Sequence, residues 1–96
     1  MPGYLIATLN SIRDPDTFTK YQKAASTIFE QYGAKFLLNS REVKNLDGDW
    51  HPSGVVVVEF KTYELAREFY NSSEYQAIIG QRFDSAVSAV VITSSV

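Results

Sequence analysis

Four consecutive valines, Val55 to Val58, constrain the fold of this chain more than any other stretch. β-Branched residues favour an extended backbone, so the run predicts a strand that continues to Phe60. Successive side chains of a strand point to opposite faces of its sheet, and an unbroken apolar run therefore leaves neither face polar. We expect both faces of this strand to be covered.

One strand and one helix are expected before the valine strand. Residues 4–9 form a compact apolar run, which predicts a central strand that is also buried on both faces. Asp14 then suits the N-cap of a helix, and Pro15 suits its first position, where the missing N–H costs nothing. Gly33 suits the left-handed residue that follows the helix end. The apolar stripe of this helix has helical spacing and comprises Phe18, Tyr21, Ala25, Ile28, Phe29 and Tyr32.

A second, more polar strand is expected at residues 35–43, at an edge of the sheet. Simple alternation places Phe36 and Leu38 on the same face of this strand. Asp47 and Gly48 mark the tip of the hairpin that joins it to the valine strand.

Two short helices are expected between the valine strand and a last strand at residues 86–93. Thr62 is a suitable N-cap for a helix over residues 63–71. The tetrapeptide Ser73-Glu74-Tyr75-Gln76 matches a capping box, so the chain breaks near Ser72 and restarts as a helix that runs to about residue 82.

The expected order is β-α-β-β-α-β with the second helix divided. This order is typical of α+β ferredoxin-like domains, which have a four-stranded antiparallel sheet with the helices on one face. Three of the four strands are too apolar for the other face to remain in water. A second copy of the chain, placed sheet against sheet about a two-fold axis, would cover that face. We therefore predict a homodimer that forms through the open sheet face.

Composition limits the classes of function. The chain has 96 residues, enough for one domain over residues 1–96, and 45% of them are hydrophobic and 21% charged, the balance of a globular protein. There is no cysteine, which excludes disulfides and thiolate chemistry and fits a cytoplasmic location. Nine basic residues are scattered among eleven acidic ones for a net charge of −2, and no segment is long enough to span a bilayer. We expect neither nucleic acid nor a membrane as a partner.

Several positions together form a recognisable pattern: Asp14-Pro15, Tyr21, Tyr32-Gly33, Glu59-Phe60, Tyr70, Ser73-Glu74-Tyr75-Gln76 and Arg82. The pattern covers nearly the whole chain and resembles that of the domain-of-unknown-function family 1330 (DUF1330). The resemblance implies a member of the dimeric α/β-barrel superfamily, in which two ferredoxin-like subunits face each other with their sheets. That superfamily includes cofactor-independent monooxygenases, haem-handling enzymes, lactone isomerases and ligand-sensing domains, so membership does not select a chemistry.

Arg82 is the first candidate site residue. It lies seven positions after Tyr75 and three after Ile79, so the three side chains share one face of their helix. A guanidinium on an apolar stripe needs acceptors, because an unpaired buried charge is costly. Two interpretations remain open. One is a structural salt bridge to Glu59 or Asp84, or a side chain that reaches solvent at the helix end; the other is a fork that holds a carboxylate in a pocket between helices and sheet.

Tyr21, Tyr75 and His51 are weaker candidates. Tyr21 and Tyr75 lie on the inward stripes of their helices, so either can donate a hydrogen bond into such a pocket, and both join Arg82 as candidate ligand-binding residues. All three are weak catalytic candidates as proton donors or acceptors, although His51, the only histidine, lies in a polar loop where a solvated side chain is the simpler interpretation. A calcium-loop spacing in the same loop fails because Trp50 stands where glycine is required, so no metal site is expected.

Two classes of function remain, beside a purely structural or interaction dimer. The first is a small dimeric protein that binds a small organic acid, a carboxylate held by Arg82. The second is a cofactor-independent enzyme, similar to a monooxygenase or an isomerase, that uses Tyr75, Tyr21 or His51. In neither case do we expect a cofactor.

Overall fold

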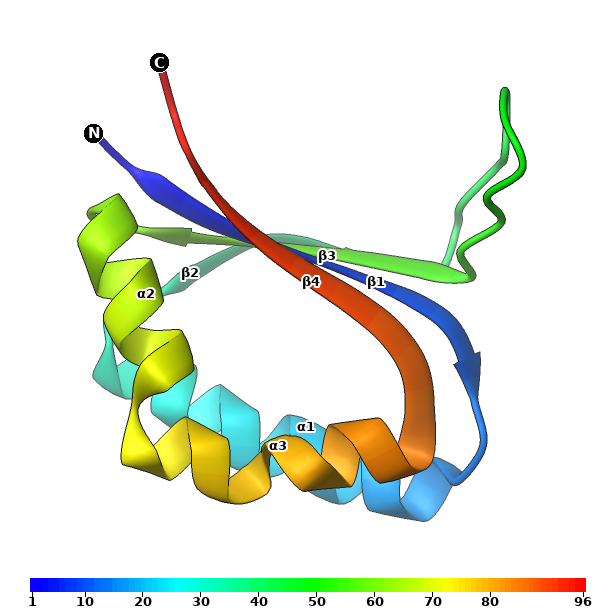
Figure 1. The fold of residues 1–96 in the computed structure, drawn as a ribbon, viewed down its shortest axis with the longest axis horizontal. Helices are drawn as coiled ribbons and strands as arrows, with labels where there is room; N and C mark the ends of the chain where they lie inside the picture. The colour runs from blue at the N-terminus through cyan, green and yellow to red at the C-terminus, as the bar shows by residue number, and fades with distance from the viewer.

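Four strands form one antiparallel sheet, and three helices lie on one of its faces (Figure 1). The computed structural model describes residues 1–96. Its elements are β1 (Gly3–Ile12), α1 (Pro15–Gln31), β2 (Lys35–Ser40), β3 (Gly54–Phe60), α2 (Tyr63–Asn71), α3 (Ser73–Ser85) and β4 (Ala86–Ser94). The strand order is β2-β3-β1-β4, so the valine strand β3 and strand β1 are central. This confirms the α+β ferredoxin-like fold with a divided second helix. None of the helices is long and apolar enough to cross a membrane.

The ends of α1 are formed by the residues expected there. A carboxylate oxygen of Asp14 accepts a hydrogen bond from the backbone N–H of Thr17 at 3.2 Å, and Pro15 is the first helical residue. The hydrogen bond from the Thr17 side chain is the main reason that the pKa of Asp14 lies below its ordinary value. Gly33 follows the helix with a φ of 65°, a left-handed conformation that glycine adopts without steric cost.

The chain breaks at Ser72, and this residue is the N-cap of α3. The Ser72 hydroxyl accepts a hydrogen bond from the backbone N–H of Tyr75 at 3.1 Å. The capping box predicted over residues 73–76 is therefore wrong by one position. Both serines have the right chemistry, but Ser72 has an extended backbone, with a ψ of 148°, whereas Ser73 is already helical.

Strand β2 differs most from the sequence prediction. It is three residues shorter than expected, and a bulge at Leu37 shifts its pairing with β3. Phe36 lies opposite Val58, whereas Leu38 lies opposite Val57. An extra residue in a strand reverses the face that the following side chains occupy. Phe36 and Leu38 therefore lie on opposite faces of the sheet, and their predicted placement on one face is wrong.

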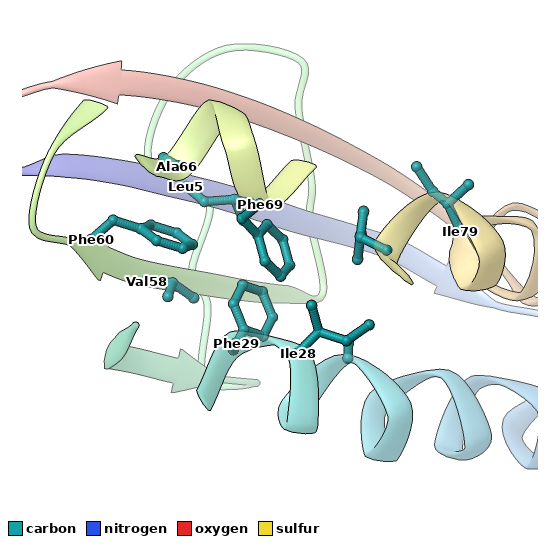
Figure 2. Close-up of a cluster of buried hydrophobic side chains, with 10 residues drawn as sticks. Leu5, Ile28, Phe29, Val58, Phe60, Ala66, Phe69 and Ile79 are labelled. Carbon is teal, nitrogen blue, oxygen red and sulfur yellow. The ribbon is translucent and has the colours of Figure 1, made fainter. Parts of the chain in front are cut away.

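The main core lies where α1 and α2 meet the sheet (Figure 2). Phe29 of α1 stacks on Phe69 of α2 with ring centroids 4.3 Å apart and planes 13° apart. Phe60 at the end of β3 lies 6.2 Å from the first ring and 5.5 Å from the second. Such aromatic pairs contribute about 0.5–1.5 kcal/mol beyond the area that they bury. Val58, the last of the four valines, is fully buried beside them, so one face of the valine strand is covered as predicted.

The other face of the sheet is covered only in part within the protomer: Thr8 is buried there, but most of its apolar side chains are not. Ile6 of β1 lies opposite Val57 of β3 and Val91 of β4, so these side chains form an apolar row on the side away from the helices. Val91 is 58% exposed. The segment 41–53, between β2 and β3, rises on this same side (Figure 1). We call this surface the open face; it comprises Ile6, Leu38, Val55, Val57, Ala89 and Val91.

Two glycines provide a matched test of the packing of β1 against α2. A Cβ at Gly3 would lie 2.5 Å from the Cα of Tyr63, whereas a Cβ at Gly80 in α3 would meet nothing within 4 Å. We expect Gly3→Ala to lower the free energy of unfolding by about 1–3 kcal/mol, because the backbone must move. Gly80→Ala should raise it by about 0.5–1 kcal/mol, because alanine favours the helix. Urea unfolding followed by circular dichroism measures both, and an unchanged stability of Gly3→Ala would contradict the close approach.

Candidate functional site

A cavity of about 360 Å³ lies between the sheet and the helices α1 and α3. Small side chains help to leave this space: Ala7 at the centre of β1, Ala25 on α1 and Ser88 on β4 all line it. Larger residues would fill it, since protein interiors normally pack to a density of about 0.74–0.76. Eleven of the sixteen lining residues are hydrophobic, which is the usual composition of a small-molecule pocket.

Arg82 is the one cation among the lining residues. It lies near the end of α3 and is only 6% exposed. Its guanidinium forms no ion pair, and its Nε has no hydrogen-bond partner. The guanidinium carbon lies 5.0 Å from the ring centroid of Phe83, a cation–π contact. A buried positive charge thus borders the cavity without a protein counterion.

The structure does not form either of the salt bridges considered for Arg82. Glu59 lies on the side of the sheet away from the helices, where it accepts a hydrogen bond from the Tyr4 hydroxyl at 3.2 Å. Asp84 is exposed, and two positions along a helix place it on a different side of α3 from Arg82. The sheet itself separates Arg82 from Glu59, which the sequence alone does not reveal.

Tyr21 and Tyr75 meet in the cavity wall. Their hydroxyl oxygens are 2.6 Å apart, and their rings lie edge to face with centroids 6.2 Å apart. Burial raises the pKa of both tyrosines above the ordinary value, while the positive charge of Arg82 acts in the opposite direction on both. Either hydroxyl can be the donor in this hydrogen bond. The hydroxyl that accepts keeps its own hydrogen for a ligand in the cavity, which both tyrosines line.

The cavity opens between α1 and the edge strand β2. Its exposed lining residues gather there: Gln22 and Ser26 on α1, and Phe36 and Asn39 on β2. Sequence reasoning missed these residues. Gln22 and Ser26 each follow a member of the apolar stripe and are four positions apart, which is the signal that would have found them. Asn39 faces the cavity only because of the bulge at Leu37, which left no signal in the sequence.

His51 lies outside the cavity. It belongs to the segment 41–53, its side chain is 67% exposed, and its Nε2 lies 3.7 Å from a carboxylate oxygen of Asp49. The structure therefore brings together three of the four residues singled out in the sequence, namely Arg82, Tyr21 and Tyr75, and leaves His51 apart from them.

Strand order, divided helix and cavity together define a ferredoxin-like domain with a candidate ligand pocket between helices and sheet. A family model described as a domain of unknown function, DUF1330, matches residues 2–96, and the chain belongs to this family. No curated protein matches the chain.

Several solved structures share the fold. A protein of unknown function from Rhodopseudomonas palustris has a TM-score of 0.80 and 16% identity, with 99% of this chain and 82% of that chain covered. A dimeric ferredoxin-like protein of unknown function from Thermobifida fusca has a TM-score of 0.64 and 14% identity, with 99% and 92% covered. SnoaB, a cofactor-independent oxygenase from Streptomyces nogalater, has a TM-score of 0.64 and 10% identity, with 98% and 91% covered. At these identities the likeness establishes the fold alone.

The buried tyrosine pair predicts a loss of stability at high pH. Tyrosines of the unfolded chain ionise near pH 10, whereas Tyr21 and Tyr75 stay protonated to higher pH in the folded protein. Above about pH 10 the unfolded state therefore binds fewer protons, and the free energy of unfolding falls by up to about 1.4 kcal/mol per pH unit for each tyrosine. Urea unfolding at a series of pH values measures this slope. Tyr21→Phe should reduce the slope and Tyr63→Phe, outside the cavity, is the control; an unchanged slope in Tyr21→Phe would contradict the interpretation.

Proposed function

We propose that the protein is a homodimer that binds a small organic acid in the cavity, with the carboxylate held by Arg82. The observation that carries this proposal is the buried guanidinium that lines the cavity without a protein counterion. Removing a cation from water costs several kcal/mol unless an anion and hydrogen-bond acceptors compensate for the lost hydration. A carboxylate supplies both, because its two oxygens match the planar fork of the guanidinium.

The tyrosine pair supports the same role. Whichever hydroxyl of the pair accepts the hydrogen bond can donate its own hydrogen to a ligand oxygen in the cavity that Arg82 also lines. The hydrogen bond and the ring contact hold this donor in place, so little further ordering is required when a ligand binds. A few oriented polar groups in a mostly apolar cavity are the usual arrangement of a small-molecule site.

The open face supports the homodimer. A contiguous exposed apolar patch marks an interaction site on many proteins. The segment 41–53 rises beside this patch and exposes Leu46 and Trp50, so these side chains can lie against a second copy (Figure 1). The structurally similar protein from Thermobifida fusca is described as dimeric. A two-fold pairing of open faces would also cover the second side of the valine strand.

An enzymatic role is the second candidate, and the Tyr21–Tyr75 hydrogen bond beside Arg82 is the observation that favours it. In this role Tyr75 donates or accepts a proton at a substrate in the cavity, without a cofactor. His51 takes no part, because it does not line the cavity. Turnover of a quinol or a lactone that is lost in Tyr75→Phe would support the enzyme, whereas turnover that survives a Tyr21→Phe, Tyr75→Phe double change would exclude this assignment.

Arg82→Met separates a ligand-binding role from a structural one. Arg82 has no ion pair to lose. We therefore expect the free energy of unfolding of the ligand-free variant to equal or exceed that of the ligand-free wild type. Removing one partner of a buried ion pair would instead cost about 3–5 kcal/mol. Thermal and urea unfolding measure this difference, with Arg67→Met on the exposed side of α2 as the control.

The same variant tests ligand binding. A carboxylate present at 100 times its Kd should stabilise the wild type by about 2.7 kcal/mol, and Arg82→Met should abolish the effect. Thermal unfolding in a panel of small carboxylates is the measurement. If no carboxylate stabilises the wild type, or if Arg82→Met responds equally, the proposed function is wrong.

Val91→Lys tests the open face. Val91 is already 58% exposed in the protomer, so a lysine there should leave the fold intact. The charged side chain should prevent the open face from packing against a second copy. Light scattering should give twice the chain mass of 10.8 kDa for the wild type and the single chain mass for the variant. Ala77→Lys, at an exposed position of α3, should remain dimeric. A wild type with the mass of one chain at micromolar concentration would exclude the homodimer.

A further inference from the structure

We infer that the ligand is an aromatic monocarboxylic acid, with one ring joined to the carboxylate through a short chain. This inference rests on the proposed function, since it takes Arg82 as the residue that holds the carboxylate. Three properties of the cavity support it: the number of charges in its wall, the kind of side chains that form the wall, and its length.

The cavity accepts one negative charge. Arg82 is the only Lys, Arg or His among the sixteen lining residues, and none of them is Asp or Glu. The remaining polar groups are neutral amides and hydroxyls. A second carboxylate on the ligand would lose its hydration without gaining a cation, and neutral donors do not compensate for that loss. A dicarboxylate or a phosphate is therefore a poor fit, and a monoanion is a good one.

Aromatic rings form much of the wall. Five of the sixteen lining residues are aromatic: Phe18, Tyr21, Phe29, Phe36 and Tyr75. The rings of Phe29 and Phe36 are 73° apart in plane, with centroids 5.3 Å apart. A ligand ring at this place can therefore meet the face of one ring or the edge of the other. An aromatic ligand gains from such geometry roughly threefold to tenfold in affinity over an aliphatic group of similar area. Phe36 is 46% exposed at the mouth, and a ligand ring would cover part of it.

The extent of the lining along α1 guides the choice of spacing between ring and carboxylate. Tyr21 lines the cavity in the first half of α1, and Phe29, which meets Phe36 of β2, lines it near the end of α1. Tyr21 and Phe29 are eight residues apart on α1, about 12 Å along the helix axis. A ring that bears the carboxylate directly spans only part of this length. A spacer of two or three carbons separates a carboxylate at Arg82 from a ring that packs against the half-exposed Phe36 at the mouth, and a cavity of about 360 Å³ has room for a ligand of this size.

A matched series of ligands tests the inference by calorimetric titration of the wild-type protein. 3-Phenylpropanoate is the reference acid; 3-cyclohexylpropanoate removes aromaticity, 3-phenylpropanamide removes the charge, and 4-(2-carboxyethyl)benzoate adds a second charge. We expect the reference acid to bind about threefold to tenfold more tightly than the cyclohexyl acid, and at least about tenfold more tightly than the amide and the dianion. Phe36 lies at a half-exposed edge position. Phe36→Leu should reduce the affinity ratio of the phenyl acid over the cyclohexyl acid and leave the ratio of acid over amide unchanged.

The outcomes separate this inference from the proposed function. Equal or tighter binding of the cyclohexyl acid or of the dianion would overturn the aromatic monoanion, while a loss of binding in Arg82→Met would still support an acid site. Binding of butyrate but not of 3-phenylpropanoate would likewise overturn the aromatic ligand and leave the acid site supported. Equal binding of acid and amide, unaffected by Arg82→Met, would overturn the proposed function itself. Failure of all the acids, butyrate included, would overturn both.

Discussion

The guanidinium of Arg82 is buried beside the cavity without a protein counterion. A buried charge of this kind needs an anion or other acceptors to replace its lost hydration. The Ser72 cap starts α3 in the phase that turns Tyr75, Ile79 and Arg82 inward. In most proteins such a position is filled by an aliphatic residue, or a neighbouring carboxylate pairs with the arginine. Here the residues around it are apolar or neutral, and an open volume lies beside it. The ligand proposed above would supply this anion.

The cavity lies between two clusters of buried side chains. The stacked rings of Phe29 and Phe69, together with Phe60 and Val58, close the core where α1 and α2 meet β3. At the start of α1, Phe18 packs with Leu9 and Ala86 in a second, smaller cluster. Between the two clusters the lining residues Ala25 of α1 and Ala7 of β1 are small, and α1 packs mainly on α3. Buried clusters on both sides therefore hold the layers together, and the small residues between them leave the cavity open.

Local chemistry explains which parts of this structure were predictable from the sequence. The Asp14 cap, Gly33 and the Thr62 cap were predicted correctly because a cap is decided by a few neighbouring residues. The start of α3 was wrong by one position because Ser72 and Ser73 are equally suitable by composition. The topology was predictable because the apolar strands and helices alternate in only one common order.

Long-range geometry explains what was missed. The bulge at Leu37 is a feature of the register between β2 and β3, and it decides that Phe36 and Asn39 line the cavity while Leu38 joins the open face. The sequence likewise left Glu59 as a partner for Arg82, because only the assembled sheet shows that the two lie on opposite sides of it. The meeting of Tyr21 and Tyr75 across two helices was predicted only as two inward-facing side chains, not as a hydrogen-bonded pair.

The state of the Arg82 side chain itself tests the central claim most directly. The chain has four arginines, so the side-chain Nε–H signals in a ¹H–¹⁵N NMR spectrum are few, and Arg82→Lys assigns the one of interest. Without ligand, the Arg82 signal should lack the downfield shift of an Nε–H that is paired with a carboxylate. Addition of 3-phenylpropanoate should move this signal downfield, while those of the three other arginines stay in place. An Arg82 signal that already has the paired shift without ligand, or that does not respond to any carboxylate, would contradict the account.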